Sequence, residues 1–552
     1  MSTPSQIEIY DSTLRDGAQT EGIAYSLDDK LIIAQRLDDL GVHFIEGGWP
    51  NPTNPKDLAF FREVRRLPLR SRVTAFGSTR RAGLSPAQDP TLDTLLRAET
   101  ETVTIFGKSW KLHVQQVLRC SLEQNLALIE DSVAYLVARG REVIYDAEHF
   151  FDGYGADPEY ALSTLLAAER GGARIVVLCD TNGGAMPSEV FRITGQMRDR
   201  LGVPLGIHTH DDTGVAVANT LLAVEAGAVH IQGTINGYGE RCGNANLCAL
   251  LPNLELKLGR HTIGSERLRG LMDASRFLSE VANVAHDHNQ PYVGESAFAH
   301  KGGVHVDAMM KAQAAYEHCD PGVVGNNRRY LLSDQAGTST IVSKLERLCP
   351  GLDKRDPSVR RLLERVKRLE HEGYQYEAAE GSFVLMAQRV QGRYKDRFSL
   401  VSFRTINRKT GDQDEESEAI VKIRVDGRVH HTVAEGDGPV NALDQALRKG
   451  LEIDFPSIRE VHLEDYKVRV LSSRDGTAAK VRVLIESTDG RDVWGTVGVS
   501  ENIIDASWIA LADSLHYKLM KDAGILPAAA ASNGAGTAAA AMIDSQQEGM
   551  TR

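Results

Sequence analysis

The chain has 552 residues, of which 42% are hydrophobic and 25% charged, the balance of a globular protein rather than a disordered one. Its formal net charge of −12 argues against general nucleic-acid binding, because a protein that neutralises phosphates needs a basic face. No apolar run reaches the ~18 residues of a membrane helix, and "MSTPSQIEIY" lacks the regions of a signal peptide, so we expect a cytoplasmic protein with no membrane partner.

The first part of the chain has the pattern of repeated β/α units. From Ile7 to about Gln232, short β-branched runs alternate with helical patterns, and eight strands are predicted at 7–12, 43–48, 72–78, 101–107, 142–149, 174–181, 204–210 and 229–234. This number and rhythm are typical of a (β/α)8 TIM barrel. A doubly wound open sheet is the alternative, but no G-x-G-x-x-G follows the first strand. We therefore predict an α/β fold with a TIM-barrel catalytic domain over residues 1–265.

Polar residues gather where the predicted strands end. They stand in "STLRDG", "GSTRR", "DAEHFFDGYG", "DTNGG", "HTHDDTG" and "TINGYGERCGNANL". A barrel brings the C-terminal ends of its strands to one face, so these segments are expected to form one site. The adjacent Arg15 and Asp16 of the first segment would be a surface ion pair on an ordinary loop, but at a barrel mouth both would meet the same ligand.

His208 and His210 stand two apart at the end of the seventh strand, so both side chains point to one face. For H-x-H alone, one packed and one solvated histidine is an equally good interpretation. Asp16 after the first strand and Asn244 after the eighth favour a metal site, because these three strands are consecutive around a closed barrel. Two imidazoles with two oxygen donors suit Mn²⁺, Mg²⁺ or Zn²⁺. The six scattered cysteines predict neither a disulfide framework nor a thiolate zinc site.

Asp146 and Glu148 stand two apart at the end of the fifth strand. A carboxylate in a desolvated pocket there could act as a general base, and an ion pair with a cation of a neighbouring strand is the alternative. Four cations near other strand ends could bind carboxylates or phosphates, although such residues are usually solvated: Arg80, Arg81, Lys108 and Arg241.

The second half of the chain divides into three parts. Residues 266–390 are largely helical in pattern and are predicted to form a connecting subdomain. In residues 391–525, "TVAEGDGPVNALDQAL" (432–447) aligns without gaps on "TVGVSENIIDASWIAL" (496–511), and each copy has the pattern of a strand, a turn and a helix. This predicts an α+β domain of two related halves. The low-complexity segment 526–552 is expected to be a disordered tail.

The motifs "DSTLRDG", "HTHDDTG", "NGYGERCGNANL" and "HKGGVHVDA" resemble signatures of the acyl-CoA-condensing branch of the DRE-TIM metallolyases, which contains the 2-isopropylmalate, homocitrate and citramalate synthases. The resemblance covers about residues 5–525. The strings "YDAEHFFDGY" and "YEHCDPGVVGNNRRYLLSDQAG" are more similar to the citramalate synthase group. This likeness implies a condensation of acetyl-CoA with pyruvate and water to give (R)-citramalate and CoA, feeding isoleucine biosynthesis.

The resemblance also implies roles for individual residues. Arg15 would hold the keto oxygen and neutralise the enolate, Thr181 would bind the keto-acid carboxylate, and Glu148 would be the acidic residue at the reacting centre. His305 and Tyr316 match residues that reach the active site from the other subunit of a homodimer, and which group removes the acetyl proton stays open. The implied metal ligands are Asp16, His208, His210 and Asn244.

The C-terminal repeat is similar to the regulatory domain of isopropylmalate and citramalate synthases, which implies feedback inhibition by an amino acid, here isoleucine. Two turns in equivalent places of the repeat, "EGDGPV" and "VSENII", are expected near the effector, with Gly436, Gly438, Ser500 and Asn502 as candidate contacts. The alternatives are a 2-isopropylmalate synthase that accepts 2-oxoisovalerate, a retro-Claisen lyase, and a catalytically silent metabolite-binding regulator. The last is disfavoured because the candidate residues are all present.

Overall fold

The computed structural model describes residues 6–51, 54–332, 336–346, 353–409, 411, 416–471 and 479–526. The chain forms two compact units, of which the first comprises Met1–Phe298 and Glu317–Arg328, and the second Ala299–Tyr316 and Arg329–Arg552. The expected disordered tail, 526–552, lies outside the described residues except for Leu526. In the described part of the chain, no helix is long and apolar enough to cross a membrane.

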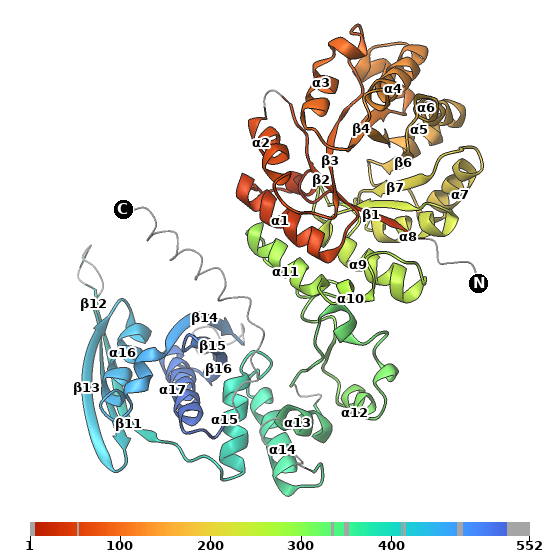
Figure 1. Ribbon diagram of the computed structural model, residues 1–552. Coiled ribbons are helices and arrows are strands. Elements are labelled where there is room, and N and C mark those ends of the chain that lie inside the picture. Colours follow the sequence, from red (N-terminus) through yellow and green to blue (C-terminus); the bar gives the residue numbers. More distant parts are fainter. Residues whose placement is uncertain are drawn as a thin grey trace. The chain divides into compact units, whose positions relative to one another are not determined.

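Eight parallel strands of the described residues close into a barrel, in which each strand pairs with the next and β8 pairs with β1 (Figure 1). Each strand begins and ends within one residue of its predicted range, and the predicted TIM-barrel fold is confirmed. The strands are β1 (Glu8–Asp11), β2 (Phe44–Gly48), β3 (Arg72–Ser78), β4 (Thr102–Lys108), β5 (Glu142–Glu148), β6 (Ile175–Asp180), β7 (Leu205–Thr209) and β8 (His230–Gly233).

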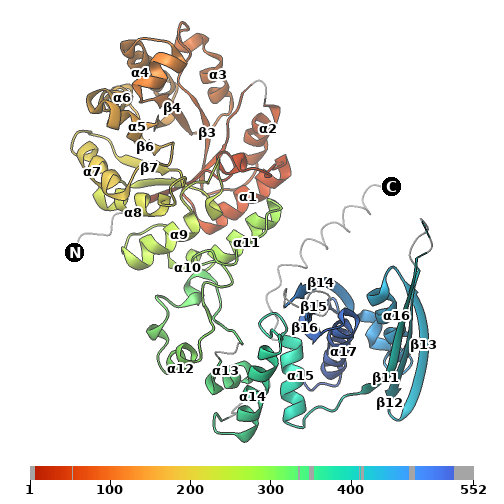
Figure 2. The same ribbon diagram turned by 180° about the vertical axis from the view of Figure 1, so that it is seen from behind.

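Helices cover the outside of the barrel (Figure 2). Two of them, α1 (Leu27–Leu40) and α4 (Leu122–Val137), begin with capping boxes in which side chains bond the free backbone N–H groups of the first turn. Gly41 ends α1 in the left-handed conformation that favours glycine. The other helices of this layer are α2 (Pro55–Val64), α3 (Pro90–Arg97), α5 (Phe150–Ala156), α6 (Pro158–Gly171), α7 (Pro187–Arg198) and α8 (Ala216–Ala226).

Successive residues of a barrel strand face alternately the helices and the barrel interior. The helix-facing residues pack into one large core, and a separate apolar cluster comprises Tyr10, Phe44, Ile144, Ile175, Val177 and Cys179. Two residues further along three of these strands, the same face carries polar side chains, namely Ser12, Glu46 and Asp146. The polar mouth therefore begins directly above an apolar core.

The chain that follows the barrel strands first packs back onto the barrel. The helices α9 (Leu247–Pro252) and α11 (Leu271–Val281) contribute to the barrel core, as does α10 (Ser265–Leu268), and this core extends to Val324. The two compact units therefore divide the chain at positions other than the predicted domain boundaries, 265 and 390.

The second unit begins with short strands and helices. These are β9 (Ala299–His300), α12 (Gly303–Lys311), β10 (Arg329–Tyr330), α13 (Thr338–Leu345), α14 (Pro357–His371) and α15 (Glu380–Val390). The last three helices share an apolar cluster with residues of the C-terminal elements, such as Val497 and Met520. These helices therefore depend on the C-terminal elements for part of their core.

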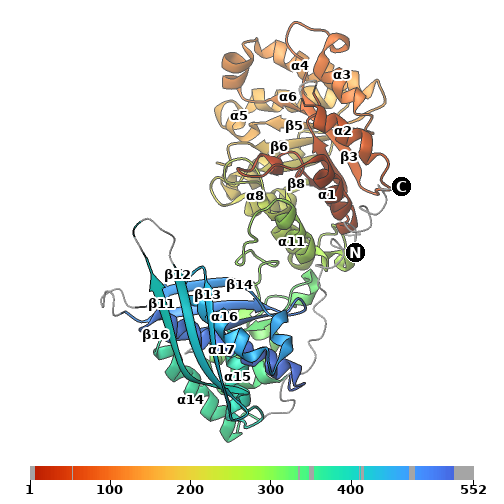
Figure 3. The same cartoon turned by 90° about the vertical axis from the view of Figure 1, so that its left-hand side faces the viewer.

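Two antiparallel three-stranded sheets, each covered by a helix, form the C-terminal part (Figure 3). One sheet contains β11 (Phe398–Arg408), β12 (Glu416–Val425) and β13 (Arg428–Gly436), followed by α16 (Pro439–Leu451). The other contains β14 (His462–Val470), β15 (Val481–Thr488) and β16 (Val493–Ser500), followed by α17 (Ile503–Asp522). Each repeat is thus a strand, a turn and a helix, as predicted, and both helices contribute to one core.

Candidate active site

Arg15 and Asp16 lie at the barrel mouth, in the turn after β1, and both side chains are largely withdrawn from solvent. Arg15 is 12% exposed and Asp16 4%. The Arg15 Nη1 atom donates to Asp16 Oδ2 at 2.9 Å, and its Nε atom donates to Glu46 Oε2 at 2.7 Å. The pair is therefore part of a buried network and not a surface ion pair.

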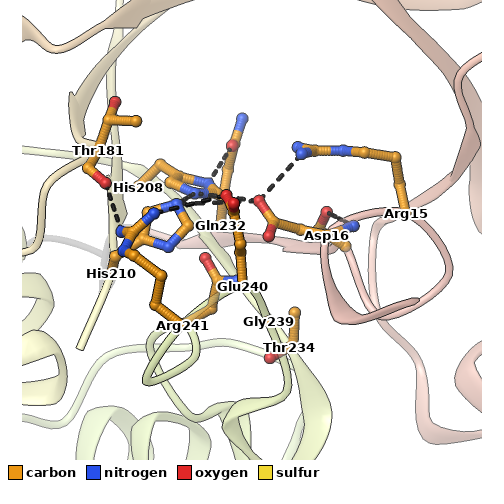
Figure 4. A network of polar contacts seen from close by, with 12 residues as sticks. Arg15, Asp16, Thr181, His208, His210, Gln232, Thr234, Gly239, Glu240 and Arg241 are labelled. Carbon is orange, nitrogen blue, oxygen red and sulfur yellow. Dashed lines mark hydrogen bonds and ion pairs between the residues drawn. The ribbon is translucent and has the colours of Figure 1, made fainter. Parts of the chain in front are cut away.

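Asp16, His208 and His210 converge at the mouth (Figure 4). The Nε2 atoms of the two histidines lie 3.2 Å apart, and they lie 3.7 Å and 3.9 Å from Asp16 Oδ2. Asn244 is held beside them, because its backbone forms a bridge with that of His210. The structure thus brings together the side chains that were predicted to share one ion.

The donor atoms of this cluster are not all used within the protein. Among the described residues, Asp16 Oδ1 and Asn244 Oδ1 are buried and have no hydrogen-bond partner. A buried acceptor without a partner is costly, and a cation would satisfy both. Two imidazole nitrogens, a carboxylate and an amide oxygen are a suitable donor set for a divalent metal ion.

The protonation states of the cluster also suit a cation. Burial alone would raise the pKa of Asp16, but Arg15 and the two histidines outweigh it and hold the pKa well below its usual range. Burial lowers the pKa of His208, and burial together with His208 lowers the pKa of His210 to about 3. At neutral pH the site therefore presents an ionised carboxylate and two neutral imidazoles, the forms that bind a metal.

Asp146 and Glu148 lie on β5 in different environments. Glu148 is paired with Lys108 of the neighbouring strand β4, which is the ion-pair alternative considered from the sequence. Asp146 is buried, and burial together with the nearby Glu46 raises its pKa to about 8. Asp146 is therefore a buried carboxyl group whose pKa lies near neutrality.

Thr181 and three of the predicted cations lie in loops of the mouth, whereas Lys108 is the last residue of β4. Thr181 Oγ1 accepts a hydrogen bond from the backbone N–H of His149 at 2.9 Å. Arg80 is bound to Asp131 and to a backbone carbonyl, and Arg241 is bound to Asp212 and to the Thr181 carbonyl. The side chains of Arg80, Lys108 and Arg241 therefore bind groups of the protein itself.

Comparison with known proteins identifies the family of this chain. The HMGL-like family model matches residues 6–276, the homocitrate synthase post-HMGL domain-like model matches 292–374, and the LeuA allosteric (dimerisation) domain model matches 377–519. The chain is 53% identical over 519 residues to an (R)-citramalate synthase of Geobacter sulfurreducens, a match that covers 94% of this chain and 98% of that protein. The chain belongs to the (R)-citramalate synthase family. An Aquifex aeolicus member is 52% identical with the same coverage, whereas a 2-isopropylmalate synthase of Methanocaldococcus jannaschii is 29% identical over 94% of this chain.

Two residues of this citramalate synthase family site were not found from the sequence. Glu46 is fully buried and binds Arg15, Ser12 and the Tyr10 hydroxyl, the last at 2.7 Å. In the sequence, the only indication of its importance was a charged residue inside the apolar run of the second strand. Gln232 bonds His208 Nδ1 at 2.9 Å and donates to Asp146 at 3.0 Å, which leaves His208 Nε2 directed at Asp16.

An aromatic wall stands beside Arg15, formed by Trp49, Phe76 and Phe106 at the ends of β2, β3 and β4. Their ring centroids lie between 5.4 and 5.7 Å apart. The Arg15 guanidinium lies 3.8 Å from the centroid of the Phe76 ring, so the wall lies next to the arginine that binds Asp16. No residue of this wall was singled out from the sequence.

The remaining predicted residues belong to the second compact unit. The rings of His305 and Tyr316 stack on each other with centroids 4.2 Å apart. Gly436 ends β13 and Gly438 precedes α16, while Ser500 ends β16 and Asn502 caps α17 through its side chain. The four candidate effector contacts thus occupy equivalent turns of the two halves, and their role stays a prediction.

Proposed function

We propose that this protein condenses acetyl-CoA with pyruvate and water to give (R)-citramalate and CoA. The observation that carries the proposal is the convergence of Arg15 with Asp16, His208 and His210 at the mouth of a barrel in a chain half identical to citramalate synthases. The reaction needs a polarised keto group, a base for the methyl proton of the thioester and a fixed cation for the enolate. Charged groups for all three purposes lie at this mouth.

A divalent ion, Mn²⁺, Mg²⁺ or Zn²⁺, would be held by Asp16, His208, His210 and Asn244. When bound, it supplies Lewis-acid polarisation of the keto and carboxylate oxygens of pyruvate. The unpartnered oxygens of Asp16 and Asn244 support this assignment.

The other residues of the mouth act directly on the substrates. Arg15 stabilises the oxygen that gains negative charge, an interaction whose loss typically costs about 3 kcal/mol of barrier. Thr181 binds the pyruvate carboxylate, and Glu148 is the acidic residue next to the reacting methyl group. His305 and Tyr316 complete the site from the partner subunit of a homodimer. Light scattering of the full chain would show whether the protein is a dimer.

The aromatic wall supports pyruvate over larger keto acids. Trp49, Phe76 and Phe106 pack against one another next to Arg15. We place the side chain of the keto acid in the space against these rings. A methyl group needs little of this space, whereas an isopropyl group would meet the rings.

A thiol-release assay with a panel of keto acids tests the function. Acetyl-CoA with pyruvate and Mn²⁺ or Mg²⁺ should release free CoA, and 2-oxoisovalerate should be a poor substitute. Equal or greater turnover with 2-oxoisovalerate would make the protein a 2-isopropylmalate synthase. Absence of thiol release with every keto acid would favour the silent regulator.

The C-terminal halves would bind isoleucine as a feedback inhibitor near Gly436, Gly438, Ser500 and Asn502. Residues of α15 pack in one apolar cluster with Val497 and Met520. Truncation at residue 390 would expose this cluster, so a variant of the full-length chain is the better test. A β-carbon at Gly438 meets no atom within 4 Å, so Gly438→Ala adds a methyl group beside the turn without a clash. We expect this variant to keep its basal turnover and to lose inhibition, whereas inhibition by leucine alone would contradict the assignment.

A further inference from the structure

Three neighbouring loops of the barrel mouth carry residues with different proposed roles in binding pyruvate and the metal ion. Thr181 follows β6, His210 follows β7 and Asn244 follows β8. If pyruvate is bound through its carboxylate by Thr181 and through its oxygens by the metal, the distance between Thr181 and the metal ligands must be fixed. Small misplacements of reacting groups can lower a rate by about 100-fold.

Arg241, in the loop after β8, binds both of the other loops, and its contact with Thr181 can be followed in Figure 4. Its Nε and Nη2 atoms donate to the two carboxylate oxygens of Asp212 at 2.7 and 2.9 Å. The Nη2 atom also donates to the backbone carbonyl of Thr181 at 2.7 Å. One planar guanidinium thus joins the loop of the carboxylate-binding threonine to the loops of the metal-binding histidine and asparagine.

Backbone contacts support this connection. Gly183 has a φ of +61°, and a β-carbon there would lie 2.5 Å from Asp212 Oδ2, so the loop after β6 needs glycine at this approach. The Thr213 hydroxyl donates to the Gly183 carbonyl at 2.7 Å, and the Asp211 N–H donates to the Gly243 carbonyl at 2.9 Å. The loops are interlocked, with Arg241 at the junction.

We propose that Arg241 is a positioning residue, which sets the place of Thr181 relative to the metal ligands and thereby the binding of the pyruvate carboxylate. This rests on the proposed function. It also gives Arg241 a different role from the one considered from the sequence, because the guanidinium holds the protein's own carboxylate and carbonyl and not the substrate.

The exposure of the Arg241–Asp212 ion pair indicates what a substitution of Arg241 should change. The side chains of Arg241 and Asp212 are 38% and 23% exposed, and such ion pairs contribute little to folding stability. The consequence of changing Arg241 should therefore appear in pyruvate binding and not in melting temperature. Lysine keeps the charge, but it has no planar fork to hold the carboxylate and the carbonyl together.

The test uses the full-length Arg241→Lys and Arg241→Gln variants and measures kcat and KM for pyruvate and for acetyl-CoA, Mn²⁺ affinity by electron paramagnetic resonance, and melting temperature. Both variants should show kcat/KM for pyruvate reduced about 10- to 100-fold, mainly through KM, with little change in the KM for acetyl-CoA or in Mn²⁺ affinity. Asp212→Asn, which leaves the Thr181 carbonyl contact, should show a smaller loss.

Arg198 provides a matched control. Its Nε and Nη2 atoms donate to Asp199 and its Nη1 atom donates to the Ala226 carbonyl at 2.9 Å, the same kind of bonding at the end of α7. Arg198→Lys should leave all kinetic constants unchanged.

Two results would overturn the positioning role. One is an unchanged KM for pyruvate in both Arg241 variants of an enzyme whose wild type uses pyruvate. The other is a loss of Mn²⁺ affinity as large as the loss of pyruvate binding, which would indicate general collapse of the mouth. If the wild type prefers another keto acid, the proposed function fails, and the same comparison with that acid still tests Arg241.

Discussion

At the base of the barrel, Glu8 receives hydrogen bonds on both carboxylate oxygens, from the Arg174 fork and from His230 Nδ1 at 3.4 Å. At the mouth, Asp16 receives Arg15 on one oxygen, while its other oxygen has no partner among the described residues. Each end thus combines a carboxylate, an arginine and histidine, but only at the base is the carboxylate bound on both of its oxygens.

The difference indicates what each network is for. A fold that satisfies a partly buried carboxylate on both oxygens gains stability from it. Each buried acceptor without a partner destabilises the folded state by about 1–3 kcal/mol. A bound ion would remove this penalty. We therefore expect substitutions at the mouth to change activity and substitutions at the base to change stability.

The largest effect is expected for Asp16→Asn. The variant keeps the shape of the side chain but removes the carboxylate proposed to bind the ion, so thiol release should fall about 100- to 1,000-fold, the range known for loss of an electrostatic catalytic group. Circular dichroism should confirm that the variant is folded at the temperature of the assay. A variant that kept more than a tenth of the activity would contradict the division between mouth and base.

Glu46→Gln should have the next largest effect. Glu46 binds the Arg15 Nε atom at 2.7 Å, and without its charge Arg15 is less firmly held in the orientation that we propose for binding the enolate. We expect a loss of about 10- to 100-fold in kcat with a smaller change in KM for pyruvate. A change confined to KM would show that Arg15 acts on ground-state binding instead.

Phe106→Ala should change selectivity more than rate. The substitution opens the aromatic wall, so the ratio of kcat/KM for 2-oxoisovalerate to that for pyruvate should rise about tenfold, as expected for one or two methyl groups in an apolar pocket. Keto-acid competition in the thiol-release assay measures this ratio. Phe61→Leu, a buried ring in the helix-side core, serves as the control and should leave the ratio unchanged.

Glu8→Gln should leave activity unchanged and reduce stability. The variant loses the charge that pairs with Arg174 and His230, so urea unfolding should show a loss of roughly 2 kcal/mol. A loss of turnover with no loss of stability would reverse the assignment of the two ends.

The contribution of Glu8 should also depend on pH. Burial alone would raise the pKa of Glu8, but hydrogen bonds from His230 and Arg174 outweigh it and lower the pKa from 4.5 to about 2. The stabilisation is then complete above about pH 4.5 and is lost as pH falls toward 2. The stability difference between wild type and Glu8→Gln should therefore be constant from pH 7 to 5 and shrink below pH 4.5.

The barrel was predictable because each strand is a short apolar run bounded by polar residues, and the mouth was predictable because parallel strands end on one face. The spacing of His208 and His210 fixed their common direction, and the structure places Asp16 between them and Arg15. These are properties that local sequence carries.

The unpredicted residues depend on contacts between distant strands. Glu46 and Gln232 lie inside strands, and only the closed barrel shows that they face Arg15, His208 and Asp146. The Lys108–Glu148 pair depends on the register of β4 and β5, which sequence periodicity does not specify. Arg241 was noticed as a cation, but its binding to Thr181 required the loop structure.

The central claim is that the incomplete network at the mouth exists to hold a metal ion. Titration of full-length protein with Mn²⁺, followed by electron paramagnetic resonance, tests it directly in the wild type, Asp16→Asn and Glu8→Gln. The account predicts one tight site per chain in the wild type and in Glu8→Gln, and none in Asp16→Asn. Tight binding that survives in Asp16→Asn, or that is lost in Glu8→Gln, would contradict it.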